Sequence, residues 1–343
     1  MKSVVLGLSG GVDSSTAAAI LRDAGYDVTG VYCLMHGHSG EGIADARAVA
    51  ESVGIKFDTV DLTGQFEKYV ISDFLDCYRN GRTPNPCTVC NPNVKFRSLC
   101  DYADRIGAEF VATGHYAGTG CENGRYFIRK SEYKDQSYML WALTQSQISR
   151  LLLPLYNEYK PDVRKRAESY GIPVAEKPDS LDLCFVPDGD YASFIERRTG
   201  PFPEGDFWLK EENRAVGRHK GIIHYTVGQR KNLGISLGVP AYVCGFDIAN
   251  NRVIISRKDV TDCTRLSCSG AVFQALDPSV GSFDADVKIR YAHKGARGKV
   301  TLTETGFTVD FYEPQRAVTP GQSAVCYLED RILCGGVINQ EEI

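Results

Sequence analysis

The pattern of hydrophobic and polar positions changes near residue 200. Before that point, short apolar runs that predict buried strands alternate with stretches at helical spacing. The predicted strands are 4–8, 28–33, 57–62 and 110–113, and the predicted helices are 13–24, 43–53 and 66–78. Gly25 and Gly54 follow the first two helices, as is typical of helix C-termini. This alternation predicts an α/β domain with a doubly covered parallel sheet, which binds ligands at the carboxyl ends of its strands.

The second part of the chain is richer in β-pattern and in turn residues. Its predicted strands are 242–246, 252–256, 286–289, 299–303, 307–311 and 324–328. Residues 198–205 are rich in Pro and Gly and predict a linker, and a softer boundary is expected at 268–271. Short strands with frequent turns predict one or two small β-barrels.

Composition narrows the class of protein. A length of 343 residues predicts two or three domains, and 43% hydrophobic with 24% charged residues excludes a disordered or fibrous chain. A net charge of −4 excludes a globally basic nucleic-acid binder but leaves room for a local basic face. The apolar run ending at Leu8 is too short for a signal peptide, and no stretch approaches the ~18 apolar residues of a membrane span. With twelve scattered cysteines, we expect a cytoplasmic protein with reduced thiols and no membrane association.

A glycine- and serine-rich segment, residues 7–15, lies between the first predicted strand and helix. Its glycines let the backbone approach an anion, and the amides of the helix N-terminus face that anion. Asp13 is suited to hold Mg²⁺ against phosphate. The alternative is a Gly/Ser turn that merely caps the helix, but the full motif in a strand–helix context favours phosphate binding. The Ser-Gly-Gly-x-Asp-Ser pattern resembles the PP-loop of ATP pyrophosphatases, which cleave ATP between its α- and β-phosphates and transfer AMP to a substrate oxygen.

Three cysteines form a second candidate site. Cys87 and Cys90 form a Cys-x-x-Cys pair in a proline-rich segment, 81–91, that predicts a stiff loop, and Cys184 is the third cysteine. Spacing alone leaves three interpretations open: structural zinc, a redox pair, or an iron–sulfur cluster with one open iron. Zinc lacks further nearby ligands, and the loop is not the usual setting of a redox pair. The remaining cysteines are expected to be small buried side chains.

Taken together, these motifs resemble the tRNA-specific 2-thiouridylases of the MnmA family over nearly the whole chain. The matching segments, in order, are 7–15, 83–91 with Lys95 and Phe96, 112–117, 134–138, 179–185, 224–231, 288–291 and 320–325. The resemblance implies a Rossmann-like ATP-pyrophosphatase domain over 1–200, a small central domain over 201–269 and a C-terminal β-barrel over 270–343, the last two contacting tRNA.

The implied reaction is the 2-thiolation of tRNA. ATP adenylates O2 of the wobble uridine, and sulfur then attacks C2, so that 2-thiouridine, AMP and pyrophosphate are formed. The implied cofactors are ATP and Mg²⁺. The implied partners are tRNA and a sulfur source, which is a cysteine desulfurase, a sulfur relay or free hydrosulfide.

The resemblance also assigns residues by position. The ATP-binding positions are Gly7, Leu8, Ser9, Gly10, Gly11, Val12, Asp13, Ser14, Ser15, Cys33 and Gly114, and the target-base positions are Asn85, Pro86 and Cys87. The tRNA-binding positions are His115, Lys134, Asp135, Gln136, Arg290, Tyr291 and Gln322, and the catalytic ones are Asp13, Cys90 and Cys184. Without the resemblance, His115 is a satisfied loop histidine, Asp135 a helix cap and Gln322 a turn residue.

Local charge agrees with an RNA partner. Six Lys or Arg and two acids fall within 210–231, and Arg290, Lys294, Arg297 and Lys299 form a second basic group. Such stretches fit a phosphate-backbone footprint, although a solvated face has the same composition.

Two mechanisms for holding sulfur remain. In one, Cys87, Cys90 and Cys184 ligate a [4Fe–4S] cluster whose open iron binds hydrosulfide; in the other, Cys184 carries a persulfide and ends in a disulfide with Cys90. We favour the cluster, because it uses Cys87 and needs no redox step after transfer. Two other functions are kept as alternatives: a PP-loop enzyme with a nitrogen nucleophile, for which Cys90 is dispensable, and a sulfur- or metal-carrying RNA-binding protein with a decayed nucleotide site.

Overall fold

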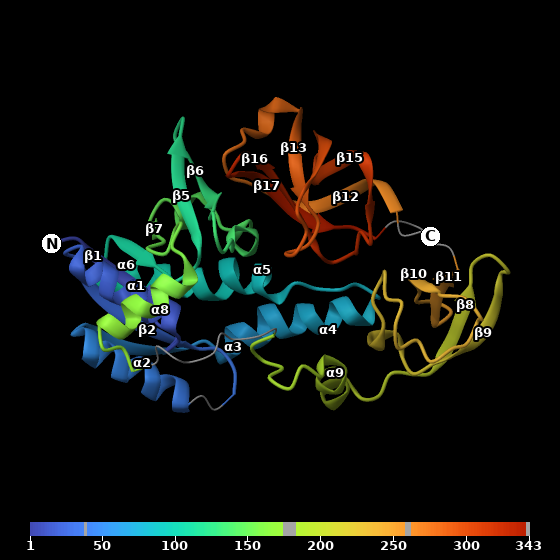
Figure 1. Cartoon of the computed structure of the whole chain (residues 1–343), viewed down its shortest axis with the longest axis horizontal. Coiled ribbons are helices and arrows are strands. Elements are labelled where there is room, and N and C mark those ends of the chain that lie inside the picture. Colours follow the sequence, from blue (N-terminus) through green and yellow to red (C-terminus); the bar gives the residue numbers. More distant parts are fainter. Residues whose placement is uncertain (38–39, 174–182, 258–261, 341–343) are drawn as a thin grey trace.

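The computed structural model describes residues 1–37, 40–173, 183–257 and 262–340, and it contains three β-sheets. Figure 1 shows the first sheet with its helices at the left, a β-barrel coloured orange to red at the upper right and a small yellow sheet at the far right. The family segment 179–185 lies partly outside the described residues, because 179–182 are not described.

The first sheet is parallel throughout, in the order β3-β2-β1-β4-β7. Its strands are β1 (Ser3–Gly7), β2 (Asp27–Leu34), β3 (Lys56–Asp61), β4 (Phe110–Ala112) and β7 (Leu151–Leu152). The four strands predicted for this region are therefore confirmed, and the fold class is as expected. β7 was not predicted, because two residues are too few to show a period.

Helices cover both faces of this sheet. α1 (Val12–Asp23), α2 (Gly40–Val53) and α8 (Lys160–Ser169) pack on one face, and α6 (Phe96–Ile106) and α7 (Gln145–Ile148) pack on the other. The remaining helices of the described residues are α3 (Thr63–Phe66), α4 (Ser72–Arg79), α5 (Pro86–Cys90) and α9 (Tyr191–Thr199), and α4 and α9 pack in a core with the central sheet. Alternate residues of β1 separate the two cores: Val4 and Leu6 pack with α1, α2 and α8, whereas Val5 packs with α6. This is the period of two that a strand buried on both faces requires.

The three predicted helices are confirmed. Gly25 and Gly54 follow α1 and α2 with φ of +84° and +74°, the left-handed conformation that ends a helix. The helix predicted over 66–78 begins earlier, at α3, and reaches α4 through a π-helical turn, η1 (Glu67–Ile71).

The predicted loop over 81–91 is wrong in its second half. Pro86–Cys90 is helical and continues through a π-helical turn, η2 (Asn91–Lys95), into α6. Pro86 is the reason, because a proline at the first helical position needs no amide partner and has the right φ. The Cys-x-x-Cys pair therefore occupies the first turn of a long helical segment.

The central unit is a four-stranded sheet in the order β10-β11-β8-β9. Its strands are β8 (Gly205–Leu209), β9 (Arg214–His219), β10 (Tyr242–Asp247) and β11 (Arg252–Ser256). The Pro- and Gly-rich segment connects α9 to β8, as the linker prediction required.

The last sheet is a closed six-stranded barrel, because β12 pairs with both β15 and β17. Its strands are β12 (Asp262–Phe273), β13 (Ser282–Lys288), β14 (Ala296–Leu302), β15 (Gly306–Arg316), β16 (Ser323–Leu328) and β17 (Arg331–Ile338). The expected boundary at 268–271 falls inside β12, so a division there would cut through the barrel.

One element joins the first region to the barrel. The hairpin of β5 (Ala117–Glu122) and β6 (Arg125–Lys130) leaves the first region and pairs with β17, with Arg129 opposite Arg331. This hairpin was not predicted from the sequence. Within the described residues, no helix is long and apolar enough to cross a membrane.

Candidate active site

The PP-loop segment follows β1 and opens α1. The Ser9 and Ser14 hydroxyls are 3.0 Å apart, and the hydroxyls of Ser14 and Ser15 donate to the Gly11 carbonyl at 3.1 and 2.8 Å. Gly11 is the N-cap of α1 and supplies no side-chain cap, so the first amides of a 12-residue helix are left for a ligand. Gly10 has a φ of +72°, and a Cβ there would lie 2.9 Å from Asp45. Glycine is therefore required where the loop passes α2.

Asp13 lies in a cluster of donors that the PP-loop motif does not reveal. Tyr116, which is fully buried, donates its hydroxyl to Asp13 Oδ1 at 2.7 Å. Lys160 Nζ, at the start of α8, lies 2.6 Å from the same oxygen, and Lys134 Nζ lies 3.8 Å from Oδ2. Lys160 was missed, because it belongs to no recognised motif and stands 147 residues from Asp13.

Gly114 and His115 form the wall beside the PP-loop. A Cβ at Gly114 would lie 2.7 Å from the Ser14 nitrogen, so only glycine allows this close approach. His115 accepts or donates at Nδ1 to the Thr113 hydroxyl at 2.8 Å and stacks on Phe96 at 5.9 Å. Burial, with a contribution from Lys95, lowers the pKa of His115 to about 3, so the ring is neutral at pH 7.

The structure brings Cys87, Cys90 and Cys184 together. The Cys184 thiol is close enough to the other two for each to act on its pKa, and all three lie in the field of the Lys95 ammonium. Cys87 and Cys184 are exposed, whereas Cys90 is buried. The Lys95 backbone amide donates to the Cys90 sulfur across the π-helical turn. Lys95 therefore stands at the centre of the sulfur site, a role that spacing did not predict.

These thiols are held in the protonated form. Although the Cys87 and Cys184 residues are exposed at the surface, protein atoms around their sulfurs displace water, and this desolvation raises the pKa of Cys184 to about 12 and also raises the pKa of Cys87. Burial likewise raises the pKa of Cys90, whereas Lys95 lowers the pKa of all three thiols. Among the described residues, no group of three or more His, Cys, Asp or Glu side chains is arranged to hold a metal ion. A thiolate or metal-bound form therefore needs an added positive charge at this site.

Cys33 links the two halves of the site. It lies near the carboxyl end of β2, and burial raises its pKa to about 11, with opposing effects from Lys95 and Cys90. The Cys90 thiol also lies 3.8 Å from the Met35 sulfur. The nucleotide position assigned to Cys33 thus borders the sulfur site directly.

The expected tRNA positions gather where the first region meets the barrel. The ion pair of Lys288 with Asp135, at 3.7 Å, brings the segment 134–136 beside β13. The Tyr291 ring lies 6.3 Å from Tyr138, and 41% of Tyr291 is exposed. Arg290 is also exposed, and its guanidinium donates to the Arg316 carbonyl at 3.3 Å.

Asp135 and Gln136 also bond within the chain. The Asp135 carboxylate accepts the Ser137 amide at 2.9 Å, but the N-cap of the helix that starts at Ser137 is Gln136, so Asp135 is not the cap weighed from the sequence. Gln136 accepts the Tyr116 amide at 3.0 Å and donates its own amide to the Tyr116 carbonyl at 2.8 Å. Gln136 therefore holds the residue that orients Asp13.

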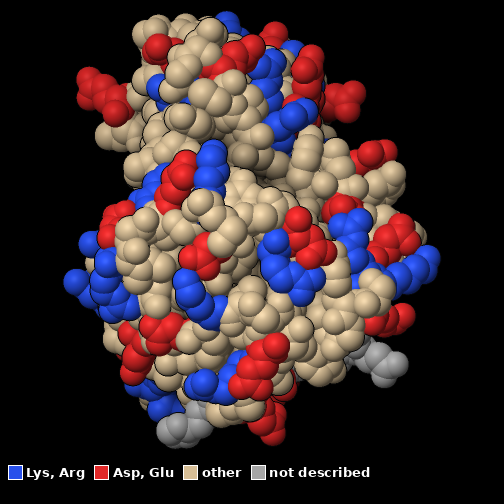
Figure 2. Space-filling model, turned by 90° about the vertical axis from the view of Figure 1, so that its left-hand side faces the viewer, with Lys and Arg blue, Asp and Glu red and all other residues tan. Residues whose placement is uncertain are grey.

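The surface carries both basic and acidic side chains on the face shown in Figure 2 and in the stretch 210–231. On the face in Figure 2, basic and acidic side chains are interspersed without a broad area of one sign. In the basic stretch 210–231, Arg214 pairs with Glu212 and Arg218 pairs with Asp206 at 2.9 Å. Part of that stretch is therefore neutralised locally.

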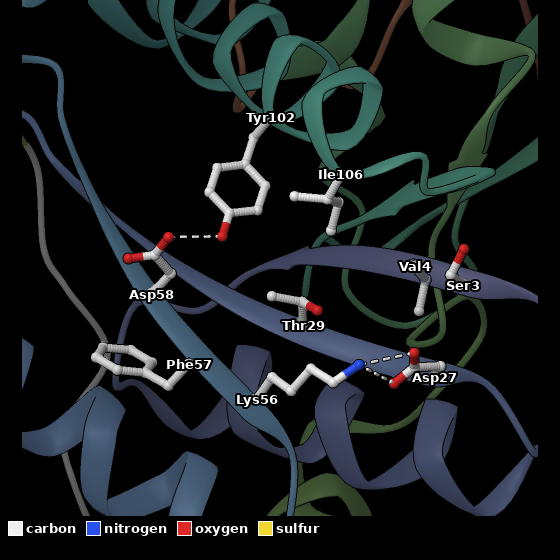
Figure 3. Close-up of a pocket in the computed structure, with 9 residues that line it drawn as sticks. All are labelled: Ser3, Val4, Asp27, Thr29, Lys56, Phe57, Asp58, Tyr102 and Ile106. Carbon is white, nitrogen blue, oxygen red and sulfur yellow. Dashed lines mark hydrogen bonds and ion pairs between the residues drawn. The ribbon is translucent and has the colours of Figure 1, made fainter.

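A separate cavity of about 340 Å³ lies at the opposite edge of the first sheet (Figure 3). It lies at the amino ends of β1, β2 and β3, and its charged groups pair with one another: Lys56 with Asp27 at 2.9 Å and Tyr102 with Asp58 at 2.6 Å. It is far from the PP-loop in the sheet and belongs to no predicted site.

Comparison with known proteins identifies the family. Three family models match consecutive parts of the chain: a tRNA methyl transferase HUP domain over 2–188, a tRNA methyl transferase PRC-barrel domain over 192–257 and an aminomethyltransferase β-barrel domain over 265–338. The tRNA-specific 2-thiouridylase MnmA of Lachnoclostridium phytofermentans is 42% identical, over 98% of this chain and 99% of its own length. That of Acetivibrio thermocellus is 41% identical over the same shares.

A solved U34-tRNA thiolase, NcsA from Methanococcus maripaludis with its [4Fe–4S] cluster, covers 57% of this chain and 67% of its own. It is 18% identical to this chain, with a TM-score of 0.35. The family models and the two full-length relatives are sufficient: the chain belongs to the MnmA family of tRNA-specific 2-thiouridylases, within the PP-loop superfamily.

Proposed function

We propose that this protein 2-thiolates tRNA in the cytoplasm: it adenylates O2 of the wobble uridine with ATP and replaces that oxygen with sulfur, releasing AMP and pyrophosphate. The observation that carries the proposal is the shared wall between the two halves of the site. Gly114 contacts the PP-loop, and the adjacent His115 lies in the field of Lys95, which also reaches the three cysteines. A base activated at the PP-loop would therefore stand next to the thiols.

The nucleotide half supplies charge and backbone donors. The open amides of α1 and the hydroxyls of Ser9 and Ser14 suit the phosphates of ATP. We propose that Lys160 and Lys134 bind these phosphates and that Asp13, released from them, holds Mg²⁺. Without nucleotide, the same lysines neutralise Asp13, so the site avoids an unpaired charge.

The thiols of the sulfur half differ in their exposure to solvent. Cys87 and Cys184 are exposed and suited to receive sulfur, whereas Cys90 is held in place by the Lys95 amide. The Lys95 ammonium favours an anionic sulfur over a neutral one. We propose that Lys95 stabilises the sulfur anion that attacks C2.

The donor set suits an iron–sulfur cluster in kind and number, since three thiols converge on one site. We propose Cys87, Cys90 and Cys184 as its ligands; a bound cluster would supply an open iron that holds sulfide. The thiols of the described residues are not yet in ligating positions, so binding requires them to approach and lose their protons. A Cys184 persulfide with Cys90 is the competing form of the same reaction.

Anaerobic purification separates these forms. A cluster predicts about four irons per chain with matching acid-labile sulfide, lost in Cys87→Ser, and thiolation that depends on hydrosulfide. An iron-free protein that thiolates tRNA with ATP and a persulfide donor would exclude the cluster. Thiolation by neither form would contradict the proposed function. An aminated product that still forms in a Cys90→Ser variant would indicate the nitrogen-nucleophile alternative, because that reaction does not need Cys90.

A further inference from the structure

The segment that leads into the cysteine helix, residues 81–85, is held by the barrel. Gln322 Nε2, in the turn before β16, donates to the carbonyls of both Thr83 and Pro84 at 3.1 Å. The Thr83 amide donates in return to the Pro320 carbonyl at 2.8 Å. These bonds join positions 238 and 239 residues apart, immediately before the helix that carries Cys87 and Cys90.

The contact is also closely packed. Gly321 has a φ of +90°, and a Cβ there would lie 2.9 Å from the Thr83 carbonyl oxygen and 3.1 Å from Arg82 Cβ. A side chain at this position would push the barrel turn, residues 319–323, away from the lead-in segment. The two backbones therefore meet without space between them.

A second connection holds the next residue. The Tyr138 hydroxyl donates to the Ser323 carbonyl at 2.8 Å, and the Asn85 amide interacts with that hydroxyl and lies 3.7 Å from the Met139 sulfur. Trp141 Nε1 donates to the Ser323 hydroxyl at 3.0 Å. Tyr138 and Trp141 both bond to Ser323 in the barrel turn. Asn85, the N-cap of α5, is therefore held from the same side as Thr83.

The central sheet borders the lead-in segment as well. A Cβ at Gly81 would lie 2.9 Å from Phe246 Cβ, and one at Gly228 would lie 2.8 Å from Ala317 Cβ, next to the barrel turn. Residues 81–85 thus lie where the three parts of the chain meet. Any shift of the barrel or of the central sheet acts first on the segment that positions the cysteines.

We propose that Gln322 is a positioning residue: with the rest of the barrel turn it fixes the lead-in segment, and through it places Cys87 and Cys90 for sulfur transfer. The link to sulfur transfer rests on the proposed function. The positions of Cys87 and Cys90 themselves can be measured in the protein without tRNA. The two bonds use the Nε2 donor of Gln322, so the positioning role is separate from the tRNA contact that is expected of this residue. Binding of tRNA across the barrel and the first region would then be coupled to the geometry of the cysteines.

The test compares Gln322→Met, which removes both donated bonds at similar volume, with Gln315→Met, a glutamine on β15 that bonds to His293. Without tRNA or ATP, iodoacetamide labelling is followed for each cysteine by mass spectrometry. Exposed Cys121, on β5, is the internal reference. We expect the labelling rates of Cys87 and Cys90 to change at least about threefold in Gln322→Met, in proportion to the two lost hydrogen bonds, while Cys121 and the Gln315→Met protein stay unchanged.

Single-turnover thiolation gives the second readout. We expect Gln322→Met to slow the chemical step about tenfold and to change the Kd for tRNA less than twofold. Gly321→Ala should do the same by steric displacement, and Gly281→Ala is its matched control, with a φ of +76° and no atom within 4 Å of the added Cβ. Thermal unfolding of each variant checks that it is folded.

An unchanged labelling rate with a weakened tRNA Kd would overturn the proposal and make Gln322 a tRNA contact. Failure of the wild-type protein to thiolate tRNA would instead contradict the proposed function, and the labelling comparison would still decide the positioning role.

Discussion

The phosphate loop at the nucleotide end is one continuous segment, to which distant residues add the partners of Asp13, whereas the cysteines at the sulfur end come from separate parts of the chain. Residues 7–15 bond mainly to one another: Ser9 to Ser14, and Ser14 and Ser15 to Gly11. At the sulfur end, Cys184 joins Cys87 and Cys90 only through folding, and Gln322 holds the residues before them. The phosphate site is therefore formed locally, while the sulfur site depends on how the domains sit together.

The nucleotide end and the sulfur end also differ in how their charged groups are paired. Asp13 has three donors around it, two of them lysines, so its negative charge is already neutralised. At the sulfur end burial keeps the thiols protonated, and Lys95 opposes this only in part. At the nucleotide end, the lysines can exchange Asp13 for a phosphate. At the sulfur end, a thiol must lose its proton before it can act as a nucleophile or a ligand.

The strongest test of this division is to remove the sulfur end alone. We expect Cys90→Ser and Cys184→Ser each to abolish thiolation, because each removes a sulfur that no other described thiol replaces in position. ATP binding should stay within about twofold of wild type, since the PP-loop makes no bond to either residue. Thiolation is measured by mass spectrometry of digested tRNA, and ATP binding by calorimetry.

Cys121→Ser is the matched control, because Cys121 is an exposed thiol on β5, away from the site. Retained thiolation in either site variant would contradict the assignment of that cysteine. Lost ATP binding would show that the two ends are one structural unit.

The reverse experiment removes a charge from the nucleotide end. We expect Lys160→Met to lower kcat/KM for ATP about 100-fold, because a preorganised cation on a transferring phosphate is typically worth about 3 kcal/mol. Iodoacetamide labelling of Cys87 and Cys90 should be unchanged. Steady-state kinetics with tRNA in excess measures the first quantity.

Lys165→Met on the same helix is the control, because Lys165 is exposed and pairs with Asp162 at 3.1 Å. If Lys160→Met left ATP kinetics intact, Lys160 would be a partner of Asp13 alone and not a phosphate ligand.

The difference between local and distant contacts also decides which parts of the site could be predicted from the sequence. The strand–turn–helix setting of residues 7–15 was predicted, because its glycines and serines form a pattern within one short segment. Lys160 was not, because its partner lies 147 residues away and a single lysine at the start of a helix has no distinctive pattern. Residues that meet only in the folded chain leave no spacing to recognise.

The cysteine segment shows a different limit. Its two prolines predicted a stiff loop, whereas Pro86 begins a helix. The three cysteines were grouped by resemblance to a family, and the central position of Lys95 among them required coordinates. The contact of Gln322 with Thr83, 239 residues apart, was equally invisible to local pattern.

A smaller effect is expected from the cation at the sulfur end. Lys95→Met should raise the pKa of Cys87, Cys90 and Cys184, because the Lys95 charge lowers each of them. At a fixed pH below these pKa values fewer thiolates are then present, so labelling should slow several-fold and its pH profile should move to higher pH. Labelling of the metal-free protein between pH 7 and 10 measures this shift. Exposed Lys294→Met is the control, and an unmoved profile would remove Lys95 from the sulfur site.

The smallest expected effect separates orientation from charge at the nucleotide end. Tyr116→Phe removes the hydroxyl that donates to Asp13 at 2.7 Å while Lys160 stays at 2.6 Å from the same oxygen. Losing one hydrogen bond to a charged group should lower the free energy of unfolding by about 2 kcal/mol, measured by urea denaturation. ATP binding should weaken only a few-fold, because the proposed phosphate cations remain. Tyr133→Phe, at a tyrosine that is 58% exposed, is the control for losing a hydroxyl nearby. If Tyr116→Phe instead weakened ATP binding as much as Lys160→Met, the orientation of Asp13, and not the lysine charge, would govern the nucleotide end. The nucleotide end would then depend on the position of the Asp13 carboxylate, and the difference in charge between it and the cysteine site would no longer explain how the two ends differ.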